Sequence, residues 1–231
     1  MPDASTSTTH SERKRRTEGV PPKSAALYCS GSSTAGSAGG RGHDPLPAQK
    51  LLVLEFAREY ELGGIELISG IACVGKGAEH QVYFDSENNL AIKITLSGTY
   101  GHSAFERGAA ASPEDYFQRL DFHNWLFPNE TRIIGVDPDT KQIITSQPWV
   151  SRTDACTPPE IDEYLAKRSF AMFPIDERDS GHYNCTNGLV ILDAHPGNVI
   201  KSGNHLFPID LVIGYPGPVL LGRIRDWFRD S

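Results

Sequence analysis

Two aspartates and an asparagine near the C-terminal end of the sequence have the residue types of a magnesium site. Asp193 and Asn198 lie on either side of a Pro-Gly turn in LDAHPGN, and Asp210 follows in PIDLV. Carboxylate and amide oxygens are ligands that hard divalent cations take. Aspartates are common in loops, so the DxxxxN spacing alone is a modest signal. The three residues together predict a site for Mg²⁺ and the phosphates bound to it.

A glycine-rich segment earlier in the chain has the composition of a phosphate-binding loop. Gly75 and Gly77 lie in GKGAEHQVY, between two stretches with the character of strands. Glycine lets backbone N–H groups approach phosphate oxygens, because it has no Cβ atom. A plain hairpin turn also uses glycine, so this segment alone leaves both interpretations open.

Residues 70–76 read GIACVGK, which also matches the GxxxxGK pattern of a P-loop. A P-loop continues with Ser or Thr, which binds the magnesium ion, and then with a helix. This chain has Gly77 at that position, and HQVYFD after it is predicted to be a strand because Val82 and Phe84 alternate with other residues. The sequence therefore argues against a P-loop NTPase.

Lys93 lies in the middle of the apolar segment LAIKIT. The two-residue period of a strand places Ala91, Lys93 and Thr95 on one face, and Ile92 and Ile94 on the other. An ammonium group in apolar surroundings is costly unless it faces an anion. Lys93 therefore lies either on an exposed face of the strand or in a cleft with an anionic partner.

The segments that would position these residues alternate between strands and helices, as in an α+β domain. A helix is predicted over residues 48–62 from its apolar spacing, ended by Gly63-Gly64. Two further helices are predicted after Ser112-Pro113 and after Thr157-Pro158-Pro159, where the sequence has cap residues and proline. A short closing helix is expected near residue 227. The predicted strands are 65–75, 80–85, 90–95, 131–137, 141–148, 188–194, 198–201 and 205–214.

Residues 1–45 are dominated by Ser, Thr, Gly, Ala, Pro and charged residues. We expect this segment to be a disordered tail, because it has too little to bury to offset the entropy of ordering it. The basic run at residues 13–16 is expected to be solvated, with a nucleic-acid or targeting patch as the alternative. An ordered domain is predicted over residues 46–231.

The composition restricts the class of protein. A hydrophobic content of 39% and a charged content of 22% are typical of a soluble globular protein. The net charge of −7 argues against a general nucleic-acid binder, which needs a basic field. No apolar stretch approaches the roughly 18 residues that span a bilayer, so no membrane partner is expected and the predicted location is cytoplasmic. The cysteines form no CxxC pair, which predicts free thiols at Cys29, Cys73, Cys156 and Cys185.

The types and order of these motifs resemble the protein-kinase-like superfamily. A closer resemblance is to the kinase domain of bacterial and phage polyvalent proteins, and it covers about residues 50–215. It is carried by GAEHQVY, YFQRLDFHNWLF, ITSQPWV and DAHPGNVIKSGNHLFPIDLVI. The resemblance implies an α+β, protein-kinase-like fold with two lobes. The N-lobe would span about 66–147, and a minimal, truncated C-lobe would span about 148–231.

The resemblance also implies binding of ATP. Gly75 and Gly77 would belong to the nucleotide loop, and Lys93 would pair with the α- and β-phosphates. Gln147, in ITSQPWV, would lie at the hinge between the lobes.

The remaining motif residues would bind metal and carry out catalysis. By resemblance, Asn198 and Asp210 would hold Mg²⁺, and Asp193 would orient or deprotonate an acceptor hydroxyl. The implied activity is an ATP-dependent phosphotransferase, a kinase that transfers the γ-phosphoryl group to a protein Ser, Thr or Tyr or to a small hydroxyl compound. The implied partners are therefore a nucleotide and a protein substrate.

The chain also departs from the kinase pattern. Ile191 and Leu192 replace the His and Arg that precede the catalytic Asp, and Val212 replaces the Gly of DFG. About twenty residues follow Asp210, too few for an activation segment and long C-lobe helices. Two alternatives stay open: a catalytically silent, pseudokinase-like module that binds nucleotide or regulates a partner, and an unrelated α+β domain. The acidic partner of Lys93 is open between Glu106, Glu114 and Asp121.

Overall fold

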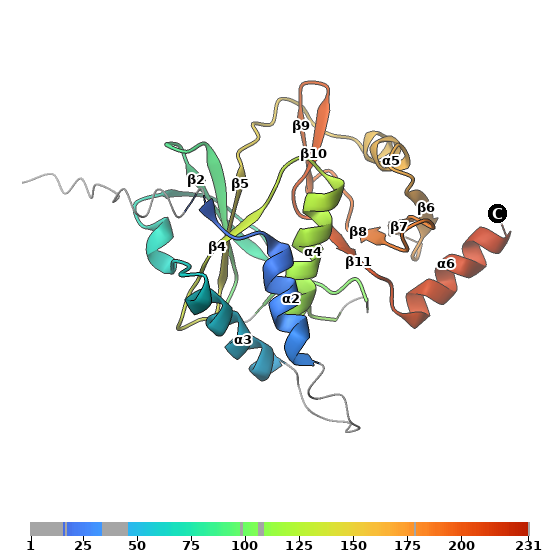
Figure 1. Cartoon of the computed structure of the whole chain (residues 1–231). Helices are drawn as coiled ribbons and strands as arrows, with labels where there is room; N and C mark the ends of the chain where they lie inside the picture. The colour runs from blue at the N-terminus through green and yellow to red at the C-terminus, as the bar shows by residue number, and fades with distance from the viewer. Residues whose placement is uncertain are drawn as a thin grey trace, which may run out of the picture. The chain divides into compact units, whose positions relative to one another are not determined.

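The computed structural model describes residues 16, 18–33, 46–97, 99–105, 109–177 and 179–230. Its helices are α2 (Pro22–Ser33), α3 (Leu46–Glu59), the 3₁₀ turn η1 (Ile65–Ile68), α4 (Pro113–Leu126), α5 (Pro158–Ala166) and α6 (Pro218–Asp230) (Figure 1). Its strands are β1 (Ala72–Lys76), β2 (His80–Asp85), β3 (Leu90–Thr95), β4 (Arg132–Val136), β5 (Ile143–Pro148), β6 (Ala171–Pro174), β7 (Ser180–Tyr183), β8 (Val190–Leu192), β9 (Val199–Ser202), β10 (His205–Pro208) and β11 (Val212–Gly214). This mixture confirms the α+β class. None of the helices described is long and apolar enough to cross a membrane.

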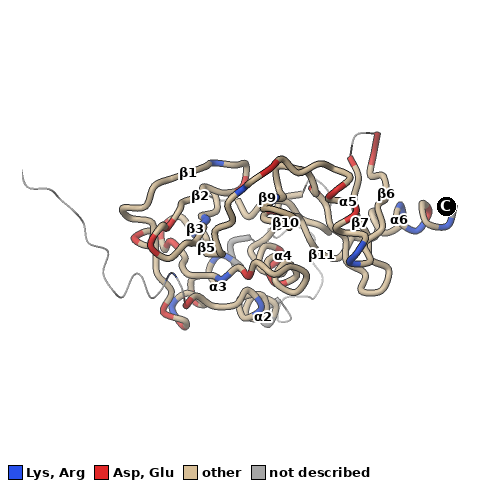
Figure 2. The backbone as a smooth tube through the Cα atoms, turned by 90° about the horizontal axis from the view of Figure 1, so that it is seen from above, with Lys and Arg blue, Asp and Glu red and all other residues tan. Residues whose placement is uncertain are grey.

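The chain divides into two compact units, and the division falls within α4. The first unit comprises Met1–Gly101, Ser112–Phe117 and Glu130–Trp149, and the second comprises His102–Ala111, Gln118–Asn129 and Val150–Ser231. Acidic and basic residues are interspersed along the described backbone (Figure 2).

The first unit is built on a five-stranded antiparallel sheet in the order β1-β2-β3-β5-β4. Ile92 and Ile94 of β3 are buried in its hydrophobic core, as their alternation predicts. The predicted strand over residues 65–75 is only partly correct, because residues 65–68 form η1 and β1 begins at Ala72. Gly70 has φ +73°, a left-handed conformation that breaks the extended run.

Residues 22–33 form α2, so the prediction of a disordered tail over residues 1–45 is wrong for this segment. Ala25 and Cys29, one helical turn apart, are fully buried, and the Tyr28 ring meets the Phe56 ring of α3 edge-on at 5.7 Å. Small side chains allow α2 to pack closely although its sequence is not strongly apolar. Burial, with a smaller effect from Glu114, raises the pKa of the Cys29 thiol to about 12. Of the rest of the predicted tail, residues 16 and 18–21 are described, and residues 1–15, 17 and 34–45 lie outside the described residues.

The segment before α2 is attached to the sheet. Val20 forms a β-bridge with Ile133 of β4, with N···O distances of 2.7 and 2.8 Å. Arg16 Nη1 lies 3.4 Å from Asp85 Oδ2, and each of these side chains is 2% exposed. Arg16 is therefore an internal ion-pair partner and not part of a solvated run. All four cysteines are free thiols, as predicted.

The second unit contains a four-stranded antiparallel sheet in the order β11-β8-β7-β6 and the two-stranded ribbon of β9 and β10. The sequence did not predict β6 or β7. The predicted strand over residues 205–214 is two strands in different sheets, and Asp210 lies in the connection between them. The closing helix is longer than expected, and α6 contributes Leu220 and Ile224 to the core beneath the sheet.

Helix α5 begins at the predicted cap and is tied to β9. Glu160 accepts hydrogen bonds from the Thr157 backbone N–H and Oγ1 at 2.9 and 2.8 Å, which forms a capping box. Lys201 Nζ lies 2.5 Å from Glu160 Oε1. The hydrogen bonds from Lys201 and then from Thr157 lower the pKa of Glu160 to about 2.

We expect Glu160→Gln to destabilise the protein at neutral pH and to have progressively less effect in acid. The folded pKa of about 2 lies below the ordinary value of 4.5, so ionised Glu160 contributes stability above pH 4.5 that is lost as the pH falls through 2. Urea unfolding of both proteins at several pH values checks this. Glu163→Gln is the control, because Glu163 forms only an exposed pair with Lys167. A difference between Glu160→Gln and wild type that stays constant down to pH 2 would contradict the assignment.

Candidate functional site

The glycines of the predicted nucleotide loop lie at the hairpin between β1 and β2. Gly75 pairs with Val82 just after a β-bulge, and a Cβ atom added to Gly75 would meet nothing within 4 Å. The Gly77 N–H donates to His80 O at 2.8 Å, which closes the turn. A strand follows this turn where a P-loop requires a helix, which confirms the argument against a P-loop NTPase.

Lys93 lies at the centre of β3, between Val82 of β2 and Thr145 of β5. Its side chain is 6% exposed, and Ala91 and Thr95 on the same face are also buried. The alternative of an exposed strand face is therefore wrong. A lysine this deeply buried requires an anionic or polar partner.

Three acids were candidates for the partner of Lys93. Glu106 lies outside the described residues, Glu114 lies in the first turn of α4 in the first unit, and Asp121 belongs to the second unit.

Gln147, the predicted hinge residue, lies on β5 opposite Ala91 and is 5% exposed. Its Oε1 accepts a hydrogen bond from Thr131 Oγ1 at 3.4 Å. The first unit ends close after it, at Trp149, whose backbone N–H donates to Asn89 O and whose ring packs on Phe84.

In the second unit, the LDAHPGN loop brings Asp193 and Asn198 into direct contact. Asn198 Nδ2 donates to Asp193 Oδ2 at 2.7 Å and to Asp193 O at 3.0 Å. Asp193 follows β8 in a left-handed conformation, with φ 59°, which Asp and Asn adopt more readily than other residues with a side chain. The spacing of five residues thus closes a loop that places a carboxylate beside an amide.

His195 contacts the same carboxylate from another side. His195 Nδ1 accepts the Gly197 N–H at 3.0 Å, so the ring proton is on Nε2, which lies 3.3 Å from Asp193 Oδ1. A Cβ atom on Gly197 would come within 2.7 Å of the His195 ring. The sequence had given His195 no role, although the His-Pro-Gly turn that folds the ring back was visible in it.

Asp210 is joined to this loop through the backbone. The N–H of the preceding residue, Ile209, donates to Asn198 O at 2.9 Å. His123 Nε2 and Asn129 Nδ2 lie 3.0 and 2.7 Å from Pro208 O and hold the end of β10. The second unit therefore gathers Asp193 and Asn198 directly and ties the Asp210 segment to them.

The donor types of Asn198 and Asp210 suit a magnesium ion. Because Nδ2 of Asn198 donates to Asp193, the ligand atom that Asn198 can offer is Oδ1. With the Asp210 carboxylate this makes two hard oxygen donors. Mg²⁺ is typically bound by one or two carboxylates together with substrate phosphates and water.

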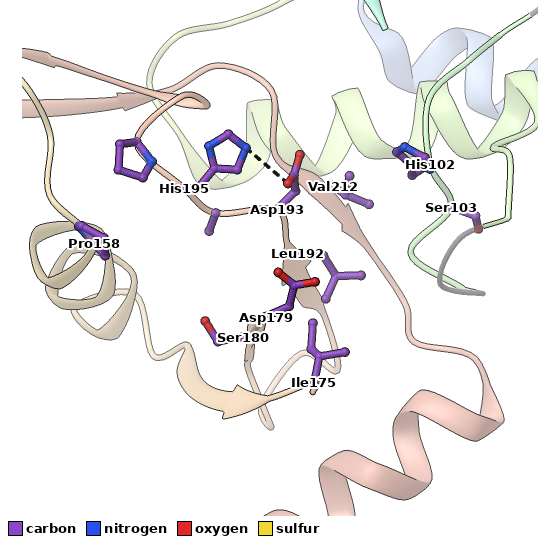
Figure 3. A pocket seen from close by; sticks show the side chains of 12 residues that line it. His102, Ser103, Pro158, Ile175, Asp179, Ser180, Leu192, Asp193, His195 and Val212 are labelled. Atoms are coloured by element: carbon purple, nitrogen blue, oxygen red, sulfur yellow. Dashed lines mark ion pairs between the residues drawn. The ribbon is translucent and has the colours of Figure 1, made fainter. Parts of the chain in front are cut away.

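A pocket of about 470 Å³ opens beside Asp193 within the second unit (Figure 3). The residues that line it are His102, Ser103, Pro158, Ile175, Asp179, Ser180, Leu192, Asp193, Ala194, His195, Pro196 and Val212. Several of these come from the β6–β7 hairpin, which was not predicted, so the pocket could not be expected from the sequence.

Comparison with known proteins is consistent with the motifs. A family model described as "Serine/Threonine/Tyrosine Kinase found in polyvalent proteins" matches residues 48–215, which include every candidate residue from Gly75 to Asp210. No curated protein and no solved structure matches the chain. The family match covers more than half of the sequence, and the chain therefore belongs to the family of serine/threonine/tyrosine kinases found in polyvalent proteins.

Proposed function

We propose that the protein is an ATP- and Mg²⁺-dependent phosphotransferase that transfers the γ-phosphoryl group to a hydroxyl acceptor, a Ser, Thr or Tyr side chain of a protein. The observation that carries the proposal is the contact of Asn198 with Asp193 at 2.7 Å, within a chain of this kinase family. A carboxylate fixed beside an amide, with Asp210 tied to the same loop, is a suitable arrangement for phosphoryl transfer.

Asp193 would act as the base. Its carboxylate accepts a hydrogen bond from Asn198 Nδ2 and lies 3.3 Å from His195 Nε2, and these two contacts hold its orientation. The acceptor's O–H proton passes to Asp193, the acceptor oxygen bonds to the γ-phosphorus, and the bond from that phosphorus to the β–γ bridging oxygen breaks to release ADP. Positioning supplies much of the acceleration in such a reaction.

Lys93, Asn198 and Asp210 would bind the nucleotide. The Lys93 ammonium would pair with the α- and β-phosphates, and Asn198 and Asp210 would hold Mg²⁺. When bound, the ion neutralises negative charge on the phosphates. Gly75 and Gly77 would cover the phosphates, and Gln147 would lie beside the nucleotide base.

Thermal unfolding of the full chain with and without Mg·ATP tests nucleotide binding. At a ligand concentration a hundredfold above Kd, we expect stabilisation of about 2.7 kcal/mol, or about 5–10 °C in Tm for a chain of this size. Lys93→Met, which keeps an apolar stem of similar length, should lose the ligand-induced shift relative to its own ligand-free Tm. Lys167→Ala is the control, because the Lys167 side chain is 69% exposed and its ion-pair partner Glu163 is equally exposed.

Each outcome has a clear meaning. The absence of a shift in wild type would contradict nucleotide binding. A shift that Lys93→Met retains would remove Lys93 from the site. A normal shift without transfer to any hydroxyl acceptor would favour the alternative, a catalytically silent, pseudokinase-like module.

A further inference from the structure

A second pocket in the second unit is lined by residues of α5, of the turn that ends this helix and of the β9–β10 ribbon. Its volume is about 410 Å³, within the roughly 300–1,000 Å³ that is usual for small-ligand sites. It shares no lining residue with the pocket beside Asp193. The described lysine, arginine and glutamate side chains that line it are Glu160, Glu163, Lys167, Arg168 and Lys201.

Both carboxylates of this lining are engaged by lysines. Lys201 Nζ lies 2.5 Å from Glu160 Oε1, and Lys167 Nζ lies 2.7 Å from Glu163 Oε1. Three cations and two acids leave the lining with one net positive charge, without counting His205. Because each acid is neutralised by a lysine, the excess charge resides at Arg168.

The backbone at the end of α5 holds Arg168 at the wall of the pocket. The Ser169 N–H donates to Ala166 O at 2.9 Å, and Ser169 has a left-handed backbone with φ 65°. The Phe170 N–H donates to Leu165 O at 3.1 Å. These two bonds form a Schellman motif, which ends the helix and fixes the residue between its last turn and Ser169.

The Arg168 guanidinium is also held by its own contacts. Its Nη1 donates to Tyr164 O at 3.1 Å, and its Cζ lies 3.7 Å from the centroid of the Tyr164 ring. That ring is stacked on Phe127, with centroids 6.1 Å apart and planes at 20°. A guanidinium has five N–H donors, and the bond to Tyr164 uses one. The others are oriented in advance, which lowers the entropy cost of binding an anion.

We propose that this second pocket binds a phosphate monoester through the Arg168 guanidinium. Arginine offers paired N–H groups to two oxygens of one phosphate. The side chains of Lys167 and Glu163 are both 69% exposed, and such a pair is weak, so Lys167 can turn from Glu163 to the phosphate. A phosphate dianion gains more from these cations than a single carboxylate does.

The ligand is thus a molecule that already carries a phosphate, which goes beyond the proposed transfer reaction. A phosphorylated side chain of a protein and a small phosphorylated compound present the same group. The pocket is separate from the Asp193 loop, so neither source needs to occupy the proposed catalytic site.

Calorimetric titration of the full chain, without ATP or Mg²⁺, tests the proposal. The probes are N-acetyl-phosphoserine amide, N-acetyl-glutamate amide and a short peptide with one phosphoserine. We expect the phosphoserine amide to bind about tenfold or more tightly than the glutamate amide. A peptide that binds more tightly than the phosphoserine amide identifies a phosphorylated protein as the source, and equal affinity identifies a small phosphorylated compound.

Matched variants assign the binding to the pocket. Arg168→Gln should lower the affinity for the phosphoserine amide about tenfold or more, because a charge-assisted paired contact is lost. Glu163→Gln should raise the affinity about twofold, because it releases Lys167 and removes a nearby negative charge. This second variant alters only an exposed side chain, so it decides the matter even where Arg168→Gln fails to fold. Arg225→Gln changes an exposed arginine of α6 that does not line the pocket, and it should bind as wild type.

Several results would overturn the proposal. They are the absence of phosphoserine binding in wild type, equal affinity for the glutamate amide, unchanged affinity in Arg168→Gln, or no increase in Glu163→Gln. Lys93→Met should bind the phosphoserine amide as wild type does, and a loss there would place the probe in the proposed nucleotide site and also overturn the proposal. Because the titrations contain neither ATP nor Mg²⁺, a failure of phosphoryl transfer would contradict the proposed function and leave this binding unchanged.

Discussion

Asp193→Asn is expected to lower kcat for phosphoryl transfer about a thousandfold, within the range for loss of a general base, and to leave Mg·ATP affinity within about twofold. The substitution replaces the carboxylate that we propose takes the acceptor's proton. It keeps an oxygen that can accept the hydrogen bond of Asn198, whose Nδ2 lies 2.7 Å away, and it keeps the side-chain shape beside His195 Nε2 at 3.3 Å. Single-turnover transfer of ³²P, with a separate binding titration, measures the two quantities.

Asparagine is the informative substitution at this position. The backbone of residue 193 has φ 59°, which Asn tolerates and which strains Ala, so Asp193→Asn separates chemistry from folding. Asp226→Asn is a matched control, because Asp226 is an exposed acid of α6 paired with Arg229. Transfer by Asp193→Asn at more than a tenth of the wild-type rate would show that another group takes the proton.

Asp85→Ala is expected to lower the free energy of unfolding by about 3–5 kcal/mol, the cost of removing one partner from a buried ion pair. Arg16 and Asp85 are each 2% exposed, so the change leaves a buried guanidinium without this carboxylate. It also removes the acceptor of hydrogen bonds from Glu87 N, Asn88 N and Asn88 Nδ2 in the β2–β3 turn. Urea unfolding of the full chain measures the change.

Two comparisons separate the ion pair from the turn. Adding Arg16→Met to Asp85→Ala should recover part of the loss, because the buried charge is then absent. Glu87→Ala, an exposed acid in the same turn, should change stability by less than about 0.5 kcal/mol. A loss below about 1 kcal/mol for Asp85→Ala would contradict the pairing. Since Arg16 and α2 belong to the first unit, these experiments need the full chain and not residues 46–231 alone.

Much of the first unit could be predicted because its strands alternate. In LAIKIT the two isoleucines that alternation places on one face lie in the core. Two helix starts were equally clear. Ser112-Pro113 and Thr157-Pro158 lie where α4 and α5 begin, and acids three residues after Ser112 and Thr157 complete the caps.

The elements that were missed have weak local signals. Helix α2 packs through Ala25 and Cys29. Small residues of this kind in a Ser- and Gly-rich segment predict a disordered tail and not a packed helix. Strand β7 has the sequence SGHY, which has neither alternation nor strong strand propensity, and it is stabilised by its pairing with β6 and β8. Tertiary pairing, and not local sequence, determines these segments.

The site was partly visible in the sequence. The sequence assigned Asp193 and Asn198 to one predicted site across a Pro-Gly turn, and in the structure their side chains are in contact. The contact of His195 with Asp193 depends on the left-handed backbone at Asp193 and on the close approach of Gly197 to the imidazole ring. Neither feature can be predicted from the spacing of residues in the sequence. Asp179 reaches the same pocket from a hairpin that the sequence did not predict, so no motif connected it with Asp193.

The central claim is that Asn198 and Asp210 form a magnesium-dependent ATP site. Calorimetric titration of the full chain with ATP, with and without Mg²⁺, tests it most directly in wild type, Asp210→Ala and the surface control Asp226→Ala. We predict binding that requires Mg²⁺ in wild type and the control, and no Mg²⁺-dependent binding in Asp210→Ala, with an unchanged circular dichroism spectrum. Unchanged ATP affinity of Asp210→Ala in the presence of magnesium would contradict the site described here.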